Sequence, residues 1–258
     1  MNDKILSIIL VSKNNSLDVK YTLDSLNGVE KLNYEILVVD SSNNLVIKNL
    51  LTDYKHFLNV KYLWTPPKGI YNAMNIGLKM SAENSYIWFL NPGDVLLNLK
   101  YVSQVLEEFN KYKINYCITQ SIYADKPYIK DNFFPKEGVE ISLENFTSGI
   151  LNFSHQATFV DKKVFHDGIL FDENYSIAAD YKLQYELVKY YVGILLPIVI
   201  VRVDILGVSH KKITKASLET SLILYRAGYF SLADTWKNFV IKCFKRLYNV
   251  AMFRILDR

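Results

Sequence analysis

Asp94 ends a short polar segment whose position is suited to chemistry. The segment Asn91-Pro92-Gly93-Asp94 follows an apolar run from Tyr86 to Leu90. Adjacent proline and glycine cannot continue a sheet, so the chain must turn here and leave Asp94 beyond the carboxyl end of a strand. A carboxylate in that position can bind a divalent cation that bridges phosphate oxygens, with the ligand supplying the remaining oxygen atoms. The structural alternative is an aspartate that caps the turn.

Asp180 is a second acid with a candidate chemical role. It lies in IAADYKLQYEL, at the start of a helical pattern. A buried carboxylate is costly without a partner or a task, although capping of the helix would also account for an aspartate here. His155 and Gln156 precede an apolar run, and His210 follows a Gly-Val-Ser turn. Each histidine alone is more often a hydrogen-bonded loop residue than a catalyst.

Two other polar loops could bind a nucleotide. Asp40 ends an apolar run, so its carboxylate can accept hydrogen bonds from a ribose or a base, or it can stabilise a turn. Lys68-Gly69 precedes a predicted helix, whose N-terminal amides attract anions together with the lysine charge. The P-loop pattern and the GxGxxG pattern are both absent from the sequence. Their absence argues against a P-loop enzyme and a dinucleotide-binding dehydrogenase.

Alternating apolar runs and helical patterns must position these loops. We expect helices between strands that are apolar on both faces, which indicates a mostly parallel sheet covered on both sides. Ligands of such sheets bind beyond the carboxyl ends of the strands, where SKNNS, DSSNN, TPPKG and NPGD would gather. The predicted strands are residues 5–11, 34–39, 60–64 and 86–90, and the predicted helices are 17–26, 45–54 and 70–80.

The pattern is less regular after residue 95. We interpret residues 1–212 as one domain, with a nucleotide-binding half (1–94) and an acceptor half (95–212), followed by a C-terminal helical region (213–258). Residues 235–258 place aromatic and aliphatic side chains at helical spacing among lysines and arginines. Such a helix either lies on a membrane surface or packs against the domain. The further predicted strands are 116–123, 128–133, 156–160 and 198–203, and the further helices are 100–112, 180–191 and several from 217 onward.

Composition excludes several classes of protein. The 258 residues are 50% apolar and suffice for a sizeable core, and the net charge of +4 without a basic aromatic stripe argues against nucleic-acid binding. Cys117 and Cys243 have no zinc-ligand or disulfide spacing, which fits a reducing cytosol. No stretch reaches the roughly 18 to 20 apolar residues of a membrane span. The N-terminus is typical of a first strand rather than a signal peptide, so we expect a cytoplasmic protein.

The order of these segments resembles that of the family 2 glycosyltransferases with the GT-A fold. The resemblance covers residues 5 to about 210 and is in particular to bacterial enzymes that assemble O-antigen, capsule or colanic-acid-like polysaccharides. Its specific parts are GIYNAMN and the region from HQATF to AADY. SIILVSKNN and VVDSSNN are more generic, and FLNPGD stands where the family has its acidic metal motif. The QxxRW element of processive synthases is absent, so addition of a single sugar is expected.

The resemblance implies both a fold and a reaction. The fold would be α/β, a Rossmann-like, mostly parallel sheet with helices on both faces and additional C-terminal helices. One sugar would pass with inversion from a nucleotide sugar, a UDP-sugar by preference, to a polyprenyl-diphosphate-linked glycan at the inner face of the cell membrane. Asp94 would bind Mn²⁺ or Mg²⁺, and Asp180 would be the general base. Donor binding is expected of Ser12, Asn14, Asp40, Lys68, Gly69 and Asn91, and acceptor or sugar binding of His155, Gln156 and His210.

Departures from the family pattern leave an alternative function open, because the NPGD turn has fewer acidic residues than the family's metal motif. Asn72 replaces the usual aspartate of GIYDAMN, and Pro67 stands where aspartate is common. The alternative is a catalytically weak sugar-nucleotide-binding or scaffolding subunit of a polysaccharide-assembly complex. A nucleotide-sugar pyrophosphorylase is disfavoured because no glycine-rich basic loop follows the first strand. The sequence leaves homo-oligomerisation open.

Overall fold

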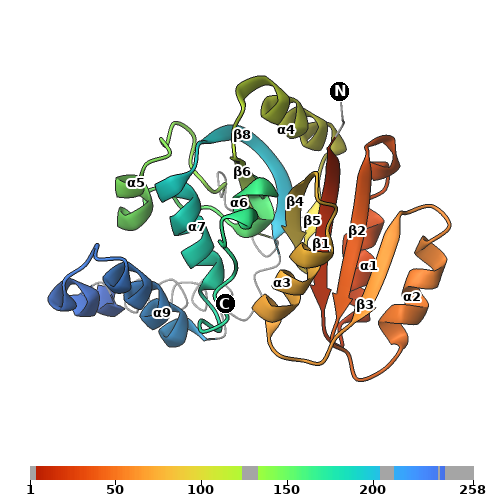
Figure 1. The fold of residues 1–258 in the computed structure, drawn as a ribbon, viewed down its shortest axis with the longest axis horizontal. Helices are drawn as coiled ribbons and strands as arrows, with labels where there is room; N and C mark the ends of the chain where they lie inside the picture. The colour runs from red at the N-terminus through yellow and green to blue at the C-terminus, as the bar shows by residue number, and fades with distance from the viewer. Residues whose placement is uncertain (1–3, 124–132, 204–211, 238, 242–258) are drawn as a thin grey trace, which may run out of the picture.

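The computed structural model describes residues 4–123, 133–203, 212–237 and 239–241. Its centre is one eight-stranded sheet of order β3-β2-β1-β4-β7-β6-β8-β5 (Figure 1). The strands are β1 (Ile5–Ser12), β2 (Tyr34–Asp40), β3 (Val60–Trp64), β4 (Ser85–Leu90), β5 (Val95–Leu96), β6 (Tyr116–Tyr123), β7 (Thr158–Asp161) and β8 (Gly193–Val203). The α-helices are α1 (Ser16–Ser25), α2 (Val46–Tyr54), α3 (Ile70–Met80), α4 (Leu99–Tyr112), α5 (Leu143–Ser148), α6 (Lys163–His166), α7 (Ala179–Tyr190) and α9 (Ile213–Arg226).

The N-terminal strands β3, β2, β1 and β4 are parallel neighbours, as the sequence predicts. In their register Asp40 lies opposite both Ser12 and Trp64, and Leu90 lies opposite Leu10. The carboxyl ends of the four strands therefore meet at one edge of the sheet, and the polar loops that follow them gather there. The second half joins the same sheet through β7, which is antiparallel to both β4 and β6.

Helices cover both faces of this sheet because strand residues alternate between two cores. Leu6, Ile8 and Leu10 of β1 belong to a core with α1, α2 and α4. Ile9 and Val11 belong to a second core on the opposite face with α3, α5, α6, α7 and α9. Burial on both faces is typical of an α/β fold and explains the nearly continuous apolar strands.

Two strands differ from the sequence prediction. The segment His155–Ala157 forms a 3₁₀ turn, η2, so β7 begins only at Thr158 rather than at residue 156. β8 begins at Gly193 instead of residue 198 and continues through Pro197. The pairing of β6 with β8 shifts register around Pro197, which accommodates a residue that cannot donate a hydrogen bond.

The region after β8 is helical where the structure describes it. α9 and the helical residues 232–237 and 239–241 confirm the predicted C-terminal helices as far as they extend. Within the described ranges, no helix combines the length and the apolar character that crossing a membrane requires. Most of the predicted strand 128–133, the loop with His210 and the last part of the tail lie outside the described residues.

Candidate active site

One histidine connects the NPGD turn to Asp180. The Nδ2 atom of Asn91 lies 3.3 Å from His155 Nε2, and His155 Nδ1 lies 3.3 Å from Asp180 Oδ2. A proton on Nδ1 can be donated to the carboxylate, while the Nε2 lone pair accepts from the amide, so a neutral imidazole satisfies both contacts. Three residues predicted separately from the sequence therefore form one continuous arrangement.

Strand pairing explains why His155 reaches Asn91. In the antiparallel pair of β4 and β7, Trp88 lies opposite Phe159, so the residues that precede β7 lie beside those that follow β4. The Trp88 indole also donates to the backbone carbonyl of Gln156 at 2.7 Å. This bond anchors the η2 turn below the site. Gln156 itself is buried, and its side chain is not part of the contact between Asn91 and His155.

Asp180 lies in the first turn of α7 and is not its cap. The N-cap residue is Ala178, so the helix-capping alternative is wrong for this aspartate. Asp180 Oδ1 accepts a hydrogen bond from the Tyr181 backbone amide (2.8 Å) and lies 3.1 Å from the Tyr71 hydroxyl, whose single proton it shares with the Ile177 carbonyl. Burial and the nearby Asp180 carboxylate raise the pKa of Tyr71, so its hydroxyl remains a donor. About 30% of the Asp180 side chain stays exposed, which leaves room for a substrate hydroxyl.

The NPGD turn holds a buried carboxylate. Asp94 is 1% exposed, and its Oδ2 accepts the Asn91 backbone amide at 2.7 Å. The turn is also fixed from α1, because the Gly93 amide donates to Thr22 Oγ1 at 2.9 Å. Asp94 therefore closes the turn, as the structural alternative to metal binding predicts.

The same turn contains oxygen atoms that suit a hard divalent cation. Within the described residues, Asn91 Oδ1 is buried without a hydrogen-bond partner. Carboxylate and amide oxygens are ligands that Mg²⁺ and Mn²⁺ accept. The described part of the chain holds no cluster of three or more histidine, cysteine or acidic residues arranged for a metal. The residues present fit a cation that takes most of its ligands from a bound diphosphate.

Asp40 organises the loops after β1 and β2. It is fully buried, and its Oδ1 accepts from Ser12 Oγ (3.1 Å), from Ser42 Oγ (2.6 Å) and from the Ser42 amide (3.0 Å). Its Oδ2 accepts from Tyr62, where burial and the hydrogen bond to Asp40 raise the tyrosine pKa to about 12. The backbone N–H of Asn14 in turn donates to Ser42 Oγ at 2.7 Å. With both oxygens engaged, this geometry favours an indirect role, in which Asp40 shapes the loops that would contact a nucleoside.

Lys68 and Gly69 lie at the beginning of α3, exposed to solvent. Gly69 is the N-cap residue with φ +114°, a conformation that residues with a Cβ rarely adopt. Two asparagine side chains of α3 donate to the Glu173 carboxylate. The distances are 3.0 Å from Asn72 Nδ2 and 2.9 Å from Asn75 Nδ2. These two hydrogen bonds lower the pKa of Glu173. An aspartate at position 72 would face this carboxylate, so Glu173 gives a physical reason for the asparagine.

Sequence reasoning missed the residues that support the predicted ones. Tyr71 contacts Asp180, and Tyr62 and Ser42 contact Asp40. Tyr71 lies within the GIYNAMN segment, whose resemblance to a family motif was a usable signal. Tyr62 gave no such signal, because a tyrosine in a half-buried strand is ordinary.

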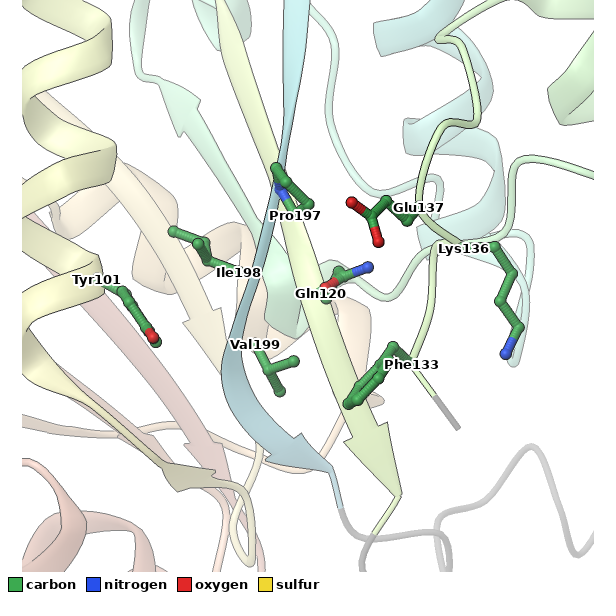
Figure 2. A pocket seen from close by; sticks show the side chains of 8 residues that line it. All are labelled: Tyr101, Gln120, Phe133, Lys136, Glu137, Pro197, Ile198 and Val199. Atoms are coloured by element: carbon green, nitrogen blue, oxygen red, sulfur yellow. The ribbon is translucent and has the colours of Figure 1, made fainter. Parts of the chain in front are cut away.

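A separate cavity of about 460 Å³ lies between β6, β8, α4 and the segment 133–137 (Figure 2). Figure 2 shows Gln120 between the β8 residues and this segment, and its Nε2 donates to the Pro135 carbonyl at 2.9 Å. None of the predicted site residues lines this cavity. The residues that do are Tyr101, Gln120, Phe133, Lys136, Glu137, Pro197, Ile198 and Val199.

Comparison of sequences identifies the class of protein that this fold and site define. The sequence profile described as "Glycosyl transferase family 2" matches residues 7–167, more than half of the chain. The chain therefore belongs to glycosyl transferase family 2 and is a glycosyltransferase. No curated protein sequence matches it.

Solved structures confirm the GT-A-like fold. Residues 1–349 of TarS from S. aureus align with a TM-score of 0.66 at 16% identity, over 95% of this chain and 72% of that one. The same TarS fragment has also been solved with UDP-GlcNAc, and that structure gives a TM-score of 0.66 at 17% identity, over 94% and 73% of the two chains. The mannosyltransferase PcManGT from Pyrobaculum calidifontis, solved with GDP-Man and Mn²⁺, gives 0.65 at 12% identity, over 96% and 75%.

Proposed function

We propose that the chain transfers one sugar from a nucleotide-sugar donor to an acceptor hydroxyl, with inversion at the anomeric carbon. The observation that carries this proposal is the contact of one imidazole with both Asn91 and Asp180. It places a partly exposed carboxylate beside the turn that would hold the donor diphosphate. Asp180 is then the general base that removes the proton of the attacking hydroxyl.

The two aspartates would divide the charge requirements of this reaction. Negative charge grows on the departing nucleotide while a proton leaves the acceptor, so one carboxylate must remain free of metal. Asp94 and Asn91 Oδ1 would hold a Mg²⁺ or Mn²⁺ ion, whose charge offsets that of the diphosphate. Asp180 keeps its own partners, because the Tyr181 backbone amide donates to one oxygen and His155 contacts the other.

The donor would bind over the carboxyl ends of β1, β2 and β3. Ser12, Asn14 and Asp40 form one hydrogen-bonded group there, and Lys68 with the first amides of α3 adds an anion-binding element. The side chain of Trp64 is 51% exposed, with its indole donating to the Ser42 carbonyl, so its ring can offer a surface to a base. A UDP-sugar is the donor we favour, in keeping with the UDP-GlcNAc bound by TarS.

The acceptor we propose is a polyprenyl-diphosphate-linked glycan in bacterial surface polysaccharide synthesis. His155 and Gln156 would border it, together with His210, which lies outside the described residues. An enzyme that uses a lipid-linked acceptor must work close to a bilayer. Leu232 and Trp236, each 61% exposed, and Val240, 44% exposed, lie at intervals of four residues and present an apolar strip that supports peripheral attachment at the inner face of the cell membrane. On this proposal residues 1–212 form the glycosyltransferase domain, and the surface for attachment lies within the C-terminal helical region, 213–258.

Replacement of Asp180 by asparagine tests the proposed reaction. Asp180→Asn keeps the size of the side chain but removes the base, so we expect transfer to fall by about 10² to 10⁴ while donor affinity stays near normal. A panel of UDP-, GDP- and dTDP-sugars with Mn²⁺ would identify the donor by thermal stabilisation, and transfer or hydrolysis of that donor would then be assayed.

The outcomes separate the two candidate functions. Loss of donor affinity with turnover preserved would make Asp180 a binding residue. A wild-type chain that binds donor but neither transfers nor hydrolyses it would favour the scaffolding subunit.

A further inference from the structure

Glu219 of α9 binds the segment that leads into α7. Its Oε1 accepts from the Ser176 amide (3.2 Å) and the Ser176 hydroxyl (3.0 Å). Its Oε2 accepts from the Ile177 and Ala178 amides, both at 2.9 Å. Three consecutive backbone amides thus converge on one carboxylate. The residue is only 7% exposed, so its carboxylate has lost most of its hydration. The four hydrogen bonds compensate for that loss.

The segment held by Glu219 is the one that positions Asp180. Ala178 is the N-cap residue of α7, and no side chain caps that helix locally. The carboxylate of Glu219 lies at the helix N-terminus, where a negative charge is favoured. The Ile177 carbonyl accepts from the Tyr71 hydroxyl at 2.5 Å, and the same hydroxyl lies 3.1 Å from Asp180 Oδ1. The single proton of the Tyr71 hydroxyl is shared between these two acceptors, so a chain of polar contacts runs from Glu219 through Ile177 and Tyr71 to Asp180.

A second contact ties α9 to the same segment. Arg226 donates to the Tyr175 hydroxyl at 3.0 Å, and its guanidinium lies 5.6 Å from the centre of that ring. In Figure 1, α9 lies beside α7, although it comes well after residues 7–167, which match the family profile. The C-terminal helix thus reaches the site from outside the matched region.

We infer that Glu219 is a positioning residue for the general base, and that α9 is part of the catalytic unit. Glu219 fixes the peptide groups of residues 176–178 and so the direction in which the Asp180 carboxylate faces an acceptor hydroxyl. This inference rests on the proposed role of Asp180. It predicts that the Glu219 carboxylate affects the chemical step far more than it affects binding of the donor.

The variant Glu219→Gln tests this inference with little change in shape. The amide can replace only one carboxylate oxygen, and its NH₂ group would face the amides of the segment. We expect kcat to fall by about 10- to 100-fold, since small misplacements of a catalytic group cost that much. Donor Kd should stay within about twofold of the wild-type value, a change of less than 1 kcal/mol. In an Asp180→Asn background the same substitution should have little further effect on kcat, because Glu219 acts through Asp180.

A second readout does not depend on activity. The chain has four histidines, and the imidazole resonances of His155 can be assigned by comparison with a His155→Gln variant. Because His155 contacts Asp180, Glu219→Gln should shift its resonances and leave those of the exposed His56 unchanged. Ile223→Val, which loses one methylene group in the buried face of α9, controls for loss of stability alone and should keep both kcat and the His155 signals.

Each result separates this inference from the proposed function. Equal losses of kcat in the wild-type and Asp180→Asn backgrounds, or an unchanged His155 signal, would overturn the positioning role. If Asp180→Asn alone left transfer intact, the proposed base would be wrong, whatever the result for Glu219.

Discussion

At the scale of single residues, Asp94 and Asp180 have different surroundings that suit different tasks. Asp94 is buried in a turn and accepts a backbone amide of that turn, which holds one of its oxygens in a fixed direction. Asp180 is partly exposed and contacts an imidazole and a phenol. A fixed carboxylate suits a metal ligand, whereas a proton acceptor must be reached by its substrate.

The role of Asp94 can be tested with Asp94→Asn. Alanine would remove a hydrogen bond that closes the turn, whereas asparagine keeps an acceptor for the Asn91 amide. We expect the variant to stay folded but to lose the gain in donor affinity that Mn²⁺ gives, measured by calorimetric titration with and without the metal. Asp53→Asn, at an exposed position of α2, makes the same charge change as a control. A Mn²⁺ effect of wild-type size in Asp94→Asn would rule out Asp94 as a metal ligand.

At the scale of elements, α3 connects the core to both sides of the site. Its first turn carries Tyr71, which contacts Asp180, and Asn72, which contacts Glu173. Its buried face packs on β1 and β2 through Met74 and Leu78. The distance between helix and sheet therefore affects the position of Tyr71.

Gly77 allows this close packing. A Cβ atom at this position would lie 2.5 Å from Ile9 Cγ2 and 3.3 Å from Val39 Cγ2. We expect Gly77→Ala to destabilise the protein by about 1 to 3 kcal/mol in chemical denaturation, the usual cost of overpacking. In an exposed helix the same change would stabilise by about 1 kcal/mol, so the sign of the effect is informative. Lys79→Ala, on the exposed side of the same helix, should change the free energy of unfolding little.

At the scale of the whole molecule, exposed apolar side chains gather after α9. Leu232, Trp236 and Val240 follow one another at intervals of four residues, next to the exposed Lys237. An apolar strip beside basic residues is the pattern of a helix that lies in a membrane surface. Packing of the tail against the domain is the alternative, and in that case these side chains would be covered.

Membrane binding predicts a result that sedimentation can measure. Vesicles containing anionic lipid should co-sediment the full chain at low salt, and truncation after Ala233 should release it. Trp236→Ser should weaken the affinity for vesicles by about 10- to 100-fold, since one buried aromatic side chain contributes about 1.5 to 3 kcal/mol. Tyr190→Ser, at an aromatic residue that is 62% exposed at the end of α7, is the matched control. If the truncated chain, shown to be folded, sediments as well as the full chain, the tail does not bind the membrane.

The sequence by itself determined the local structure and the class of protein. Runs such as Tyr86 to Leu90 are apolar at every position, which is typical of a strand buried on both faces. The spacing of apolar residues predicted α3 at residues 70–80, as observed. Asp94 could be placed beyond the end of a strand because proline and glycine require a turn there. The order of these segments also indicated glycosyl transferase family 2, which the match to residues 7–167 confirms.

Only the tertiary structure decided which of these residues meet. Asn91 and His155 are 64 residues apart, and their contact depends on the antiparallel pairing of β4 with β7, which residue spacing does not encode. Glu219 lies in an amphipathic helix, where its sequence context is that of a surface acid. Its role follows from the packing of α9 beside the start of α7. Periodicity specifies which face of an element is buried, but contacts between distant elements arise from the way those buried faces combine in three dimensions.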